Sequence, residues 1–216
     1  MEIDRISTLL RPFLEEPLFP SQLQQVSIYI DTLLRWNARI NLTALRSPEE
    51  IVTRHFGESF FLARHLFPHK HKEESYGKGR RVLDIGSGAG FPGLPLKIWN
   101  PEINLTTIES NQKKATFLRE VVRTLELDDV VVRTDRAEEL GSDPGFLRSD
   151  FVTFRAVENF EKILNLAVTF LVPGGRLAVL VGASQNGSLR EVSQVRWEDA
   201  ILVPQSHSRI LAIGAI

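Results

Sequence analysis

The sequence predicts an α/β fold: a mostly parallel, doubly wound sheet with an antiparallel C-terminal strand, preceded by an N-terminal helical extension. From residue 80 onward, short apolar strands alternate with helical segments, which is typical of a parallel sheet with right-handed crossovers. The first of these strands runs directly into three glycines at alternate positions. Residues 1–67, in contrast, carry the apolar spacing of helices.

Two helix starts organise the N-terminal extension. Ser21 with Gln24 predicts a capping box that opens a helix to about Trp36. The run Ser47-Pro48-Glu49-Glu50 predicts a second helix to about Leu66, because it offers a capping Ser, a Pro at the first helical position and an acid three residues on.

The chain divides near residue 80 in this interpretation. We expect residues 1–79 to form the helical extension and a polar linker, and residues 80–216 to form the sheet domain. The expected strands are 81–85, 105–109, 130–133, 151–155 and 175–181, and the expected helices are about 94–99, 111–125, 137–140 and 159–171. Two late segments, Trp197–Val203 and Ser208–Ile213, predict a closing hairpin and therefore an antiparallel strand.

Composition narrows the class of protein. The 216 residues include 27 Asp and Glu, 26 Lys and Arg, 43% hydrophobic residues and no Cys. The absence of Cys excludes disulfides, thiol nucleophiles and thiolate metal sites. No basic segment followed by an apolar run opens the sequence, and no apolar stretch approaches membrane-spanning length. We therefore expect a cytoplasmic protein with no membrane anchor, no metal and no obligate protein partner.

The first strand and the loop after it carry the most specific signal. The apolar strand 81–85 leads into Gly86, Gly88 and Gly90. Glycine lacks a Cβ, so the backbone can turn sharply and lie against a ligand. Doubly wound sheets hold nucleotide-like cofactors at this position. Asp84 lies two residues before the first glycine, where we expect its carboxylate to face the ligand.

Two cofactors compete for this loop. Gly88, Gly90 and Gly93 satisfy the dinucleotide fingerprint, and Glu109 lies about 20 residues further on, where a ribose-binding acid is expected. A dinucleotide, however, brings an anionic pyrophosphate, which Asp84 would repel. S-adenosyl-L-methionine brings a sulfonium cation and an ammonium group but no phosphate, so the acid favours this methyl donor.

Further candidate ligands follow the other strands, at the edge where open α/β sheets bind ligands. Glu109 can accept both hydroxyls of a ribose, and its competing role is a helix N-terminal acid. Ala137-Glu138 follows the third strand and can contact the edge of an adenine. The competing interpretation is a surface turn. Arg155 ends the fourth strand, where a buried cation needs a partner. In a functional role this partner is the cofactor carboxylate, Asp84 or a substrate oxygen. The competing interpretation is a structural ion pair.

Charge is distributed unevenly along the chain. The window 35–81 holds ten Lys and Arg against five Asp and Glu. Such an excess beside a cofactor loop can meet a polyanion, but a solvated helix face explains it equally well. His55 lies near an apolar helix face, where a hydrogen-bonded core histidine is commoner than a catalytic one.

Several segments beyond the glycine loop make the chain resemble one known family, the glucose-inhibited division protein B family. They are Trp36-Asn37 with Asn41-Leu42-Thr43-Ala44, Arg54-His55, Val82 to Gly93, Glu109-Ser110-Asn111-Gln112-Lys113-Lys114, Phe117-Leu118, Arg136-Ala137-Glu138-Glu139 and Arg155-Ala156-Val157. The glycine loop alone indicates only a large superfamily, whereas the Lys pair and the Asn41-Leu42-Thr43 segment are much narrower signals.

The resemblance implies a class I, Rossmann-like methyltransferase sheet and a function. Members of the family transfer a methyl group from S-adenosyl-L-methionine to N7 of a guanine in small-subunit (16S) ribosomal RNA. Cofactor contacts would then fall at Gly86, Phe91, Ala137-Glu138 and Arg155, beside Asp84, Gly88, Gly90 and Glu109 from the loop argument. Candidates for contact with the RNA, or with the small ribosomal subunit, are Arg54, His55, Lys113 and Lys114.

The chemistry implied needs few reactive groups. Guanine N7 carries a lone pair and no proton, so methyl transfer needs no general base and rests on positioning and electrostatics. We therefore predict no essential nucleophile, and Arg155 is the one candidate catalytic residue. Three rival functions stay open: a small-molecule methyltransferase, a dinucleotide oxidoreductase and a non-enzymatic RNA-binding module.

Overall fold

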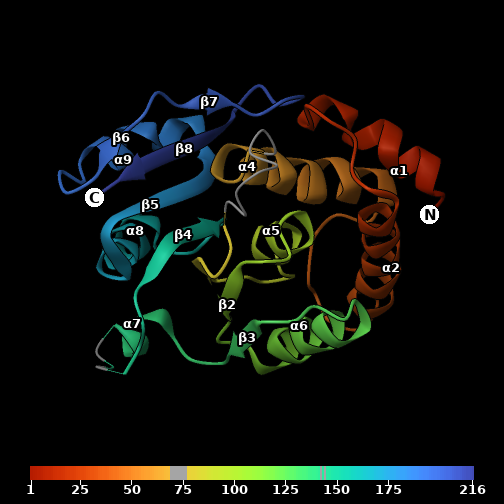
Figure 1. Cartoon of the computed structure of the whole chain (residues 1–216), viewed down its shortest axis with the longest axis horizontal. Helices are drawn as coiled ribbons and strands as arrows, with labels where there is room; N and C mark the ends of the chain where they lie inside the picture. The colour runs from red at the N-terminus through yellow and green to blue at the C-terminus, as the bar shows by residue number, and fades with distance from the viewer. Residues whose placement is uncertain (69–76, 142, 144) are drawn as a thin grey trace.

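The computed structural model describes residues 1–68, 77–141, 143 and 145–216. Within these residues an eight-stranded sheet has the order β3-β2-β1-β4-β5-β8-β6, with β7 beside β8 (Figure 1). The strands are β1 Arg81–Ile85, β2 Asn104–Ile108, β3 Val130–Arg133, β4 Ser149–Arg155, β5 Leu171–Gly182, β6 Arg196–Trp197, β7 Ile201–Leu202 and β8 Arg209–Ala215. Strands β1 to β5 pair in parallel, and β8 is antiparallel to β5, as the sequence predicts.

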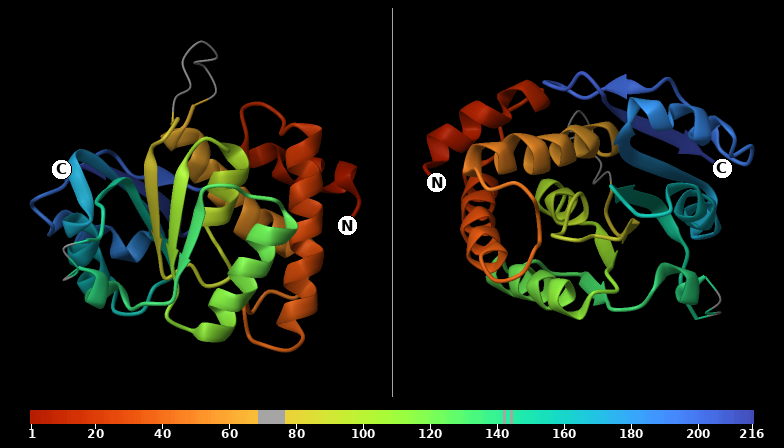
Figure 2. Two further views of the ribbon diagram at one scale, coloured as in Figure 1. Left: turned by 60° about the horizontal axis from the view of Figure 1, so that its bottom comes forward. Right: turned by 180° about the vertical axis from the view of Figure 1, so that it is seen from behind.

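Helices cover both faces of the sheet. In chain order the helical segments are α1 Ile3–Leu10, a 3-10 turn Arg11–Phe13, α2 Pro20–Asn37, α3 Pro48–Glu50, a π-helical segment Ile51–Gly57, α4 Glu58–Leu66, α5 Gly93–Trp99, α6 Gln112–Thr124, α7 Ala137–Leu140, α8 Phe160–Thr169, a 3-10 turn Ala183–Gln185 and α9 Asn186–Arg190. One apolar cluster joins α1, α2, α4, α5 and α6 to one sheet face, and a second joins α7, α8 and α9 to the other. Figure 2 shows α2 standing beside α6 in both views.

The two helix starts differ from expectation in detail. The capping box predicted at Ser21 and Gln24 is wrong, because the helix begins two residues earlier, with Phe19 as its N-cap and Pro20 at its first position. Gln22 fills the role instead: its side-chain oxygen accepts a hydrogen bond from the amide of Phe19 at 2.9 Å. Pro fixes φ near the helical value and needs no amide partner there, which explains the shift.

The second predicted helix starts where expected, with Ser47 before Pro48, although the Ser side chain makes no capping hydrogen bond. It continues through the π-helical segment and α4 to Leu66. At the other end of the chain, the segment predicted as one strand over Trp197–Val203 forms two short strands, β6 and β7, which both pair with β8.

The helical extension packs on the sheet domain through a single continuous core. The side-chain amide of Gln22 donates to the carbonyl of Ile98 at 2.9 Å, and the indole N–H of Trp99 donates to the carbonyl of Phe67 at 2.9 Å. These bonds tie α2 and the end of α4 to α5, the helix that follows the glycine loop. The extension is therefore placed to support that loop from behind.

Candidate cofactor cleft and arginine cluster

The loop after β1 has positive φ angles at its three glycines. Gly86, Gly88 and Gly90 have φ of 66°, 57° and 87°, a region that residues with a Cβ rarely adopt. At Gly90 the absent Cβ also serves packing, because an added one would collide with the hydroxyl of Tyr29. The loop thus turns sharply at the end of β1 and presents its backbone at the carboxyl edge of the sheet.

A cleft of about 430 Å³ opens at this edge, beside the ends of β1, β2 and β4. It is lined by Ile85, Gly86, Ile108, Glu109, Ser110, Asn111, Lys114, Asp135, Arg136, Ala137, Glu138, Ala156, Val157, Glu158, Asn159 and Ile163. Four residues predicted to contact the cofactor, Gly86, Glu109, Ala137 and Glu138, are therefore brought together. The parallel topology places them there, because successive strands end at the same edge.

Glu109 anchors the floor of the cleft. One carboxylate oxygen accepts from the amide of Gly88 at 2.9 Å, and the other accepts from the amide of Asn111 at 2.8 Å. A carboxylate oxygen has more than one acceptor position, so both oxygens can accept further hydrogen bonds from a ligand. The side chain thus holds the loop and the start of the next helix while it lines the cleft, and its role as a ribose acceptor stays a prediction.

Ala137 and Glu138 stand at the opening of α7. Ala137 is buried, whereas the Glu138 carboxylate reaches across to α8 and forms an ion pair with Lys162 at 2.8 Å. The hydrogen bond from Lys162 lowers the pKa of Glu138, so this carboxylate is charged at neutral pH. Glu138 thus lines the cleft, where the sequence places an adenine contact, while its ion pair with Lys162 suits a residue of a surface turn. The adenine contact stays a prediction.

Asp84 lies behind the loop. Its side chain is fully buried, and one oxygen accepts a hydrogen bond from the amide of Gly93 at 3.1 Å. Its second oxygen has no hydrogen-bond partner among the described residues, and Asp84 is absent from the cleft lining. Burial raises the pKa of Asp84 to about 7. The carboxylate thus holds the start of α5, and the sequence could not distinguish this placement from direct exposure to a ligand.

Phe91 also lies outside the cleft lining, in a stack of three rings. Its ring lies between Tyr29 of α2, at a centroid distance of 5.3 Å, and His55 of the π-helical segment, at 4.6 Å. The two interplanar angles are 10° and 21°. Both flanking rings come from the N-terminal extension, so the extension fixes the position of the loop residue.

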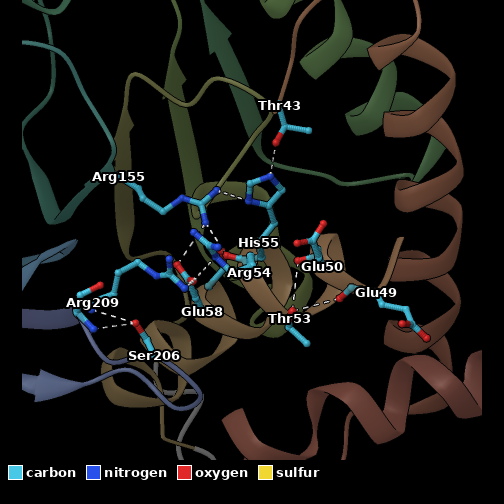
Figure 3. Close-up of polar contacts among 12 residues, drawn as sticks. Thr43, Glu49, Glu50, Thr53, Arg54, His55, Glu58, Arg155, Ser206 and Arg209 are labelled. Atoms are coloured by element: carbon cyan, nitrogen blue, oxygen red, sulfur yellow. Dashed lines mark hydrogen bonds and ion pairs between the residues drawn. The ribbon is translucent and has the colours of Figure 1, made fainter. Parts of the chain in front are cut away.

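Arg155 and His55, which the sequence pairs only through the family resemblance, are direct partners (Figure 3). Arg155 Nη1 donates to the carbonyl oxygen of Arg54 at 2.8 Å, and Nη2 donates to His55 Nδ1 at 2.7 Å. Since a guanidinium only donates, Nδ1 is the acceptor and the His55 proton lies on Nε2, which donates to Thr43 Oγ1 at 2.8 Å. Burial, followed by the charge of Arg155, lowers the pKa of His55 to about 2, so the ring is neutral.

Two residues that the sequence analysis missed complete this group. The carboxylate of Glu58 forms ion pairs with Arg209 at 2.6 Å, with Arg54 at 3.6 Å and with Arg155 at 3.6 Å. We call Arg54, Arg155 and Arg209, with Glu58, the arginine cluster. Glu58 follows Arg54 by four residues, a helical pairing that the sequence could have suggested. Nothing local points to Arg209, because the antiparallel register of β8 brings it there.

Lys113 and Lys114 face different hollows. Lys114 lines the cofactor cleft, whereas Lys113 lines a separate groove of about 460 Å³ between α2 and α6. The other residues of this groove are Arg35, Trp36, Arg39, Ile40, Thr116 and Glu120. Part of the basic window 35–81 thus does lie beside Lys113, next to the cleft.

The end of that window does not lie beside the cofactor loop. Arg80 and Arg81 lie at the amino end of β1, so the whole strand separates them from the glycine loop. There Arg80 forms an ion pair with Asp150 at 2.8 Å. Lys70 and Lys72 lie outside the described residues.

The described residues lack two features that would point to other functions. No group of three or more His, Cys, Asp and Glu side chains is arranged there to hold a metal ion. In the same part of the chain, no helix combines the length and the apolar character needed to cross a membrane.

Comparison with known proteins identifies the family. A family model described as GidB, rRNA small subunit methyltransferase G, matches residues 22–205. A relative from Desulfitobacterium hafniense named ribosomal RNA small subunit methyltransferase G is 36% identical over 187 residues, which is 86% of this chain and 74% of that protein. A relative of the same name from Dictyoglomus thermophilum is 37% identical over 184 residues, 85% of this chain and 70% of that protein.

A solved structure supports the fold. The crystal structure of a SAM dependent methyltransferase from Aquifex aeolicus has a TM-score of 0.52 and 20% identity, and the match covers 70% of this chain and 90% of that one. This likeness confirms the class I methyltransferase sheet that the sequence predicts. The family model covers most of the chain and the relatives share more than a third of the aligned residues, so this protein belongs to the GidB family, the rRNA small subunit methyltransferase G family.

Proposed function

We propose that this chain binds S-adenosyl-L-methionine in the cofactor cleft and transfers its methyl group to N7 of a guanine in the RNA of the small ribosomal subunit. Membership of the family supplies the reaction class, an S-adenosylmethionine-dependent methyl transfer to 16S ribosomal RNA. The choice of guanine N7 rests on the resemblance of the motifs. The proposal also places the protein in the cytoplasm, with ribosomal RNA as its partner.

The observation that carries the proposal is the chemistry of the cleft. Four acids, Glu109, Asp135, Glu138 and Glu158, and two cations, Lys114 and Arg136, line it, and Asp135 and Glu138 are paired with Arg133 and Lys162. A cleft with no surplus of cations leaves a pyrophosphate without a counter-charge, whereas it suits a ligand that is cationic and lacks phosphate. This chemistry favours a sulfonium cofactor over a dinucleotide, and family membership sets the oxidoreductase aside.

The residues have distinct roles in this proposal. Glu109 would accept ribose hydroxyls, the backbone at Ala137 and Glu138 would meet the adenine, and Gly86 would let the ligand lie against the loop. Asp84, Gly88, Gly90 and Phe91 hold the loop in shape from behind. The cofactor, when bound, supplies an electrophilic methyl group, and the protein supplies position and charge.

Methyl transfer to N7 needs no proton acceptor, and the hydrogen bonds of His55 leave it none to offer. Both of its ring nitrogens are engaged, one with Arg155 and one with Thr43, and the ring is neutral. His55 therefore orients Arg155, and Arg155 remains the candidate for contact with the reacting base. Guanine O6 lies next to N7 and accepts hydrogen bonds from arginine, which suits a guanidinium at the end of β4.

The decisive experiment follows transfer of a tritiated methyl group to naked 16S RNA, small subunits and whole ribosomes, with nucleoside analysis of the product. We expect label in N7-methylguanosine from one or more of these RNAs. Label at another atom would overturn the choice of N7, and no label in any RNA would overturn the function itself. Arg155→Ala should reduce turnover strongly while the matched variant Arg148→Ala, an exposed residue before β4, should not.

A further inference from the structure

The arginine cluster carries more positive charge than its own carboxylate balances. Glu58 is one carboxylate among three guanidiniums, and it is almost completely buried. His55 is neutral, and the buried Asp84, whose pKa is raised to about 7, is the other acid that acts on Arg155. Even with Asp84 ionised, one positive charge is left over at a partly buried place, where charge repulsion is only weakly screened. An anion placed there would remove this repulsion.

The cations of the cluster are more exposed than its carboxylate. The exposed fraction of the side chain is 3% for Glu58, 15% for Arg155, 25% for Arg209 and 49% for Arg54. The carboxylate is thus the buried centre of the cluster, and Figure 3 shows the three arginine side chains meeting around it. Arg155 uses one N–H on Arg54 and one on His55, and a guanidinium has five, so donors remain for a ligand.

The topology explains why three distant segments meet here. Arg54 and Glu58 come from consecutive turns of one long helix, Arg155 ends β4, and Arg209 begins β8. Because β8 runs antiparallel to β5, its first residue lies opposite Gly182, at the carboxyl end of the parallel strands. Arg209 therefore reaches the same sheet edge as the glycine loop. The Arg155 guanidinium lies 5.4 Å from the centre of the Phe91 ring in that loop.

The cluster is adjacent to the cofactor cleft and distinct from it. None of its four residues lines the cleft, whereas Ala156 and Val157, directly after Arg155, do. A ligand group held by the arginines would thus lie beside the cofactor. Arginine prefers oxyanions such as carboxylate and phosphate, which it binds through two parallel hydrogen bonds.

We propose that Arg54 and Arg209 form an oxyanion site that holds a backbone phosphate of the substrate RNA beside Arg155 and the cofactor, and that Glu58 is the positioning residue that orients the guanidiniums. The proposal rests on the function proposed above. The position outside the cleft and the exposure of Arg54 and Arg209 favour the RNA phosphate over the other available oxyanion, the carboxylate of the cofactor.

The test compares Arg209→Gln with Arg196→Gln in the full-length protein. Arg196 is an exposed arginine on β6 at the opposite edge of the sheet, so its variant loses the same charge elsewhere. We expect Arg209→Gln to raise the KM for 16S RNA about tenfold, as loss of a charged hydrogen bond does. In direct RNA binding it should lower the slope of log affinity against log salt by about 1. The dissociation constant for S-adenosyl-L-methionine, measured by calorimetry, should not change.

Three results would overturn the site. A weakened cofactor affinity with unchanged RNA binding would assign the oxyanion to the cofactor carboxylate. Unchanged KM and unchanged salt slope would make the cluster structural. An equal loss of RNA affinity in Arg196→Gln would show that the effect depends on net charge and not on this site. If the wild-type protein transferred no methyl group to RNA, the proposed function would be wrong. The change in the salt slope of RNA binding in Arg209→Gln would then be the test of the oxyanion site.

The role of Glu58 needs its own readout. Glu58→Gln should raise the KM for RNA more than it lowers kcat, and Glu58→Asp should restore part of the loss. The effects of Glu58→Gln and Arg209→Gln should not add, because both act on one group of contacts. If Arg209→Gln alone fails to fold because Glu58 is left unpaired, the double variant removes both charges and carries the RNA measurement. Fully additive effects would contradict the positioning role.

Discussion

The hydroxyl of Tyr29 donates a hydrogen bond of 2.6 Å to the carbonyl oxygen of Ala89, and so joins the N-terminal helices to the glycine loop. Tyr29 is completely buried, and the hydroxyl occupies the space that a side chain at Gly90 would need. The loop that faces the cofactor is therefore shaped by a residue some 60 positions earlier in the chain. This dependence can be measured.

Tyr29→Phe should destabilise the protein by about 1 to 3 kcal/mol, because a buried carbonyl loses its partner. It should also weaken cofactor binding several-fold, since the loop is no longer held. Urea unfolding and calorimetry measure the two effects. Ser27→Ala is the matched control: its hydroxyl on the same helix bonds only the carbonyl of Met1. Unchanged cofactor affinity in Tyr29→Phe would show that the loop holds its shape alone.

Asp84 should make stability depend on pH in an unusual direction. Its folded pKa of about 7 lies above the ordinary value of 3.8, so the folded state holds the proton more tightly than the unfolded chain does. Its contribution is fully present below about pH 4 and is lost as pH rises toward 7, a loss on the order of 4 kcal/mol. Asp84→Asn removes this loss, so its stability relative to wild type should increase with pH in urea unfolding. A difference that stays constant across that range would contradict the buried carboxyl.

His55 should not titrate in the physiological range. Its pKa of about 2 lies below the ordinary 6.5, so the folded ring stays neutral while the unfolded one protonates. Stability from this source is present above about pH 6.5 and is lost as pH falls. Nitrogen-15 NMR should show the Nε2–H tautomer unchanged between about pH 8 and pH 5. A His55 ring that titrates in this range would contradict the hydrogen bond that it accepts from Arg155.

Glu109→Ala should reduce both stability and cofactor affinity. The carboxylate accepts from the amides of Gly88 and Asn111, so its loss leaves two backbone donors without a partner at about 1 to 3 kcal/mol. The cofactor would lose its ribose acceptor as well. Thermal unfolding without ligand measures the first effect and calorimetry the second. A stable variant with normal cofactor affinity would leave Glu109 without either role.

Lys113→Glu should weaken RNA binding without changing cofactor affinity. The side chain lines the groove that contains Arg35, Trp36 and Arg39, outside the cofactor cleft. Phosphate contacts release counterions, so the variant should also show a shallower salt dependence. Arg123→Glu, at the far end of α6, changes the same charge away from the groove. Equal losses in both variants would indicate a general charge effect.

Much of this architecture could be predicted because it depends on local patterns. The strand before Gly86 and the acid at Glu109 follow from rules about what stands at the ends of parallel strands, and both lie where those rules place them. The arginine cluster could not be predicted, since Glu58 and Arg209 meet only through an antiparallel pairing far apart in sequence. The burial of Asp84 was equally hidden, because a strand residue beside a glycine loop can face the ligand or the helix behind it.

The insertion of β8 between β5 and β6 also has a consequence for biosynthesis. Every strand that forms the glycine loop and the cleft is made before β8, and chains begin to fold from their N-terminal part during synthesis. A nascent chain can therefore shape the cofactor cleft early, while Glu58 has Arg54 and Arg155 beside it but still lacks Arg209. Pairing of the last strand would then add Arg209 to the arginine cluster, so the RNA site would be completed only when the sheet is complete.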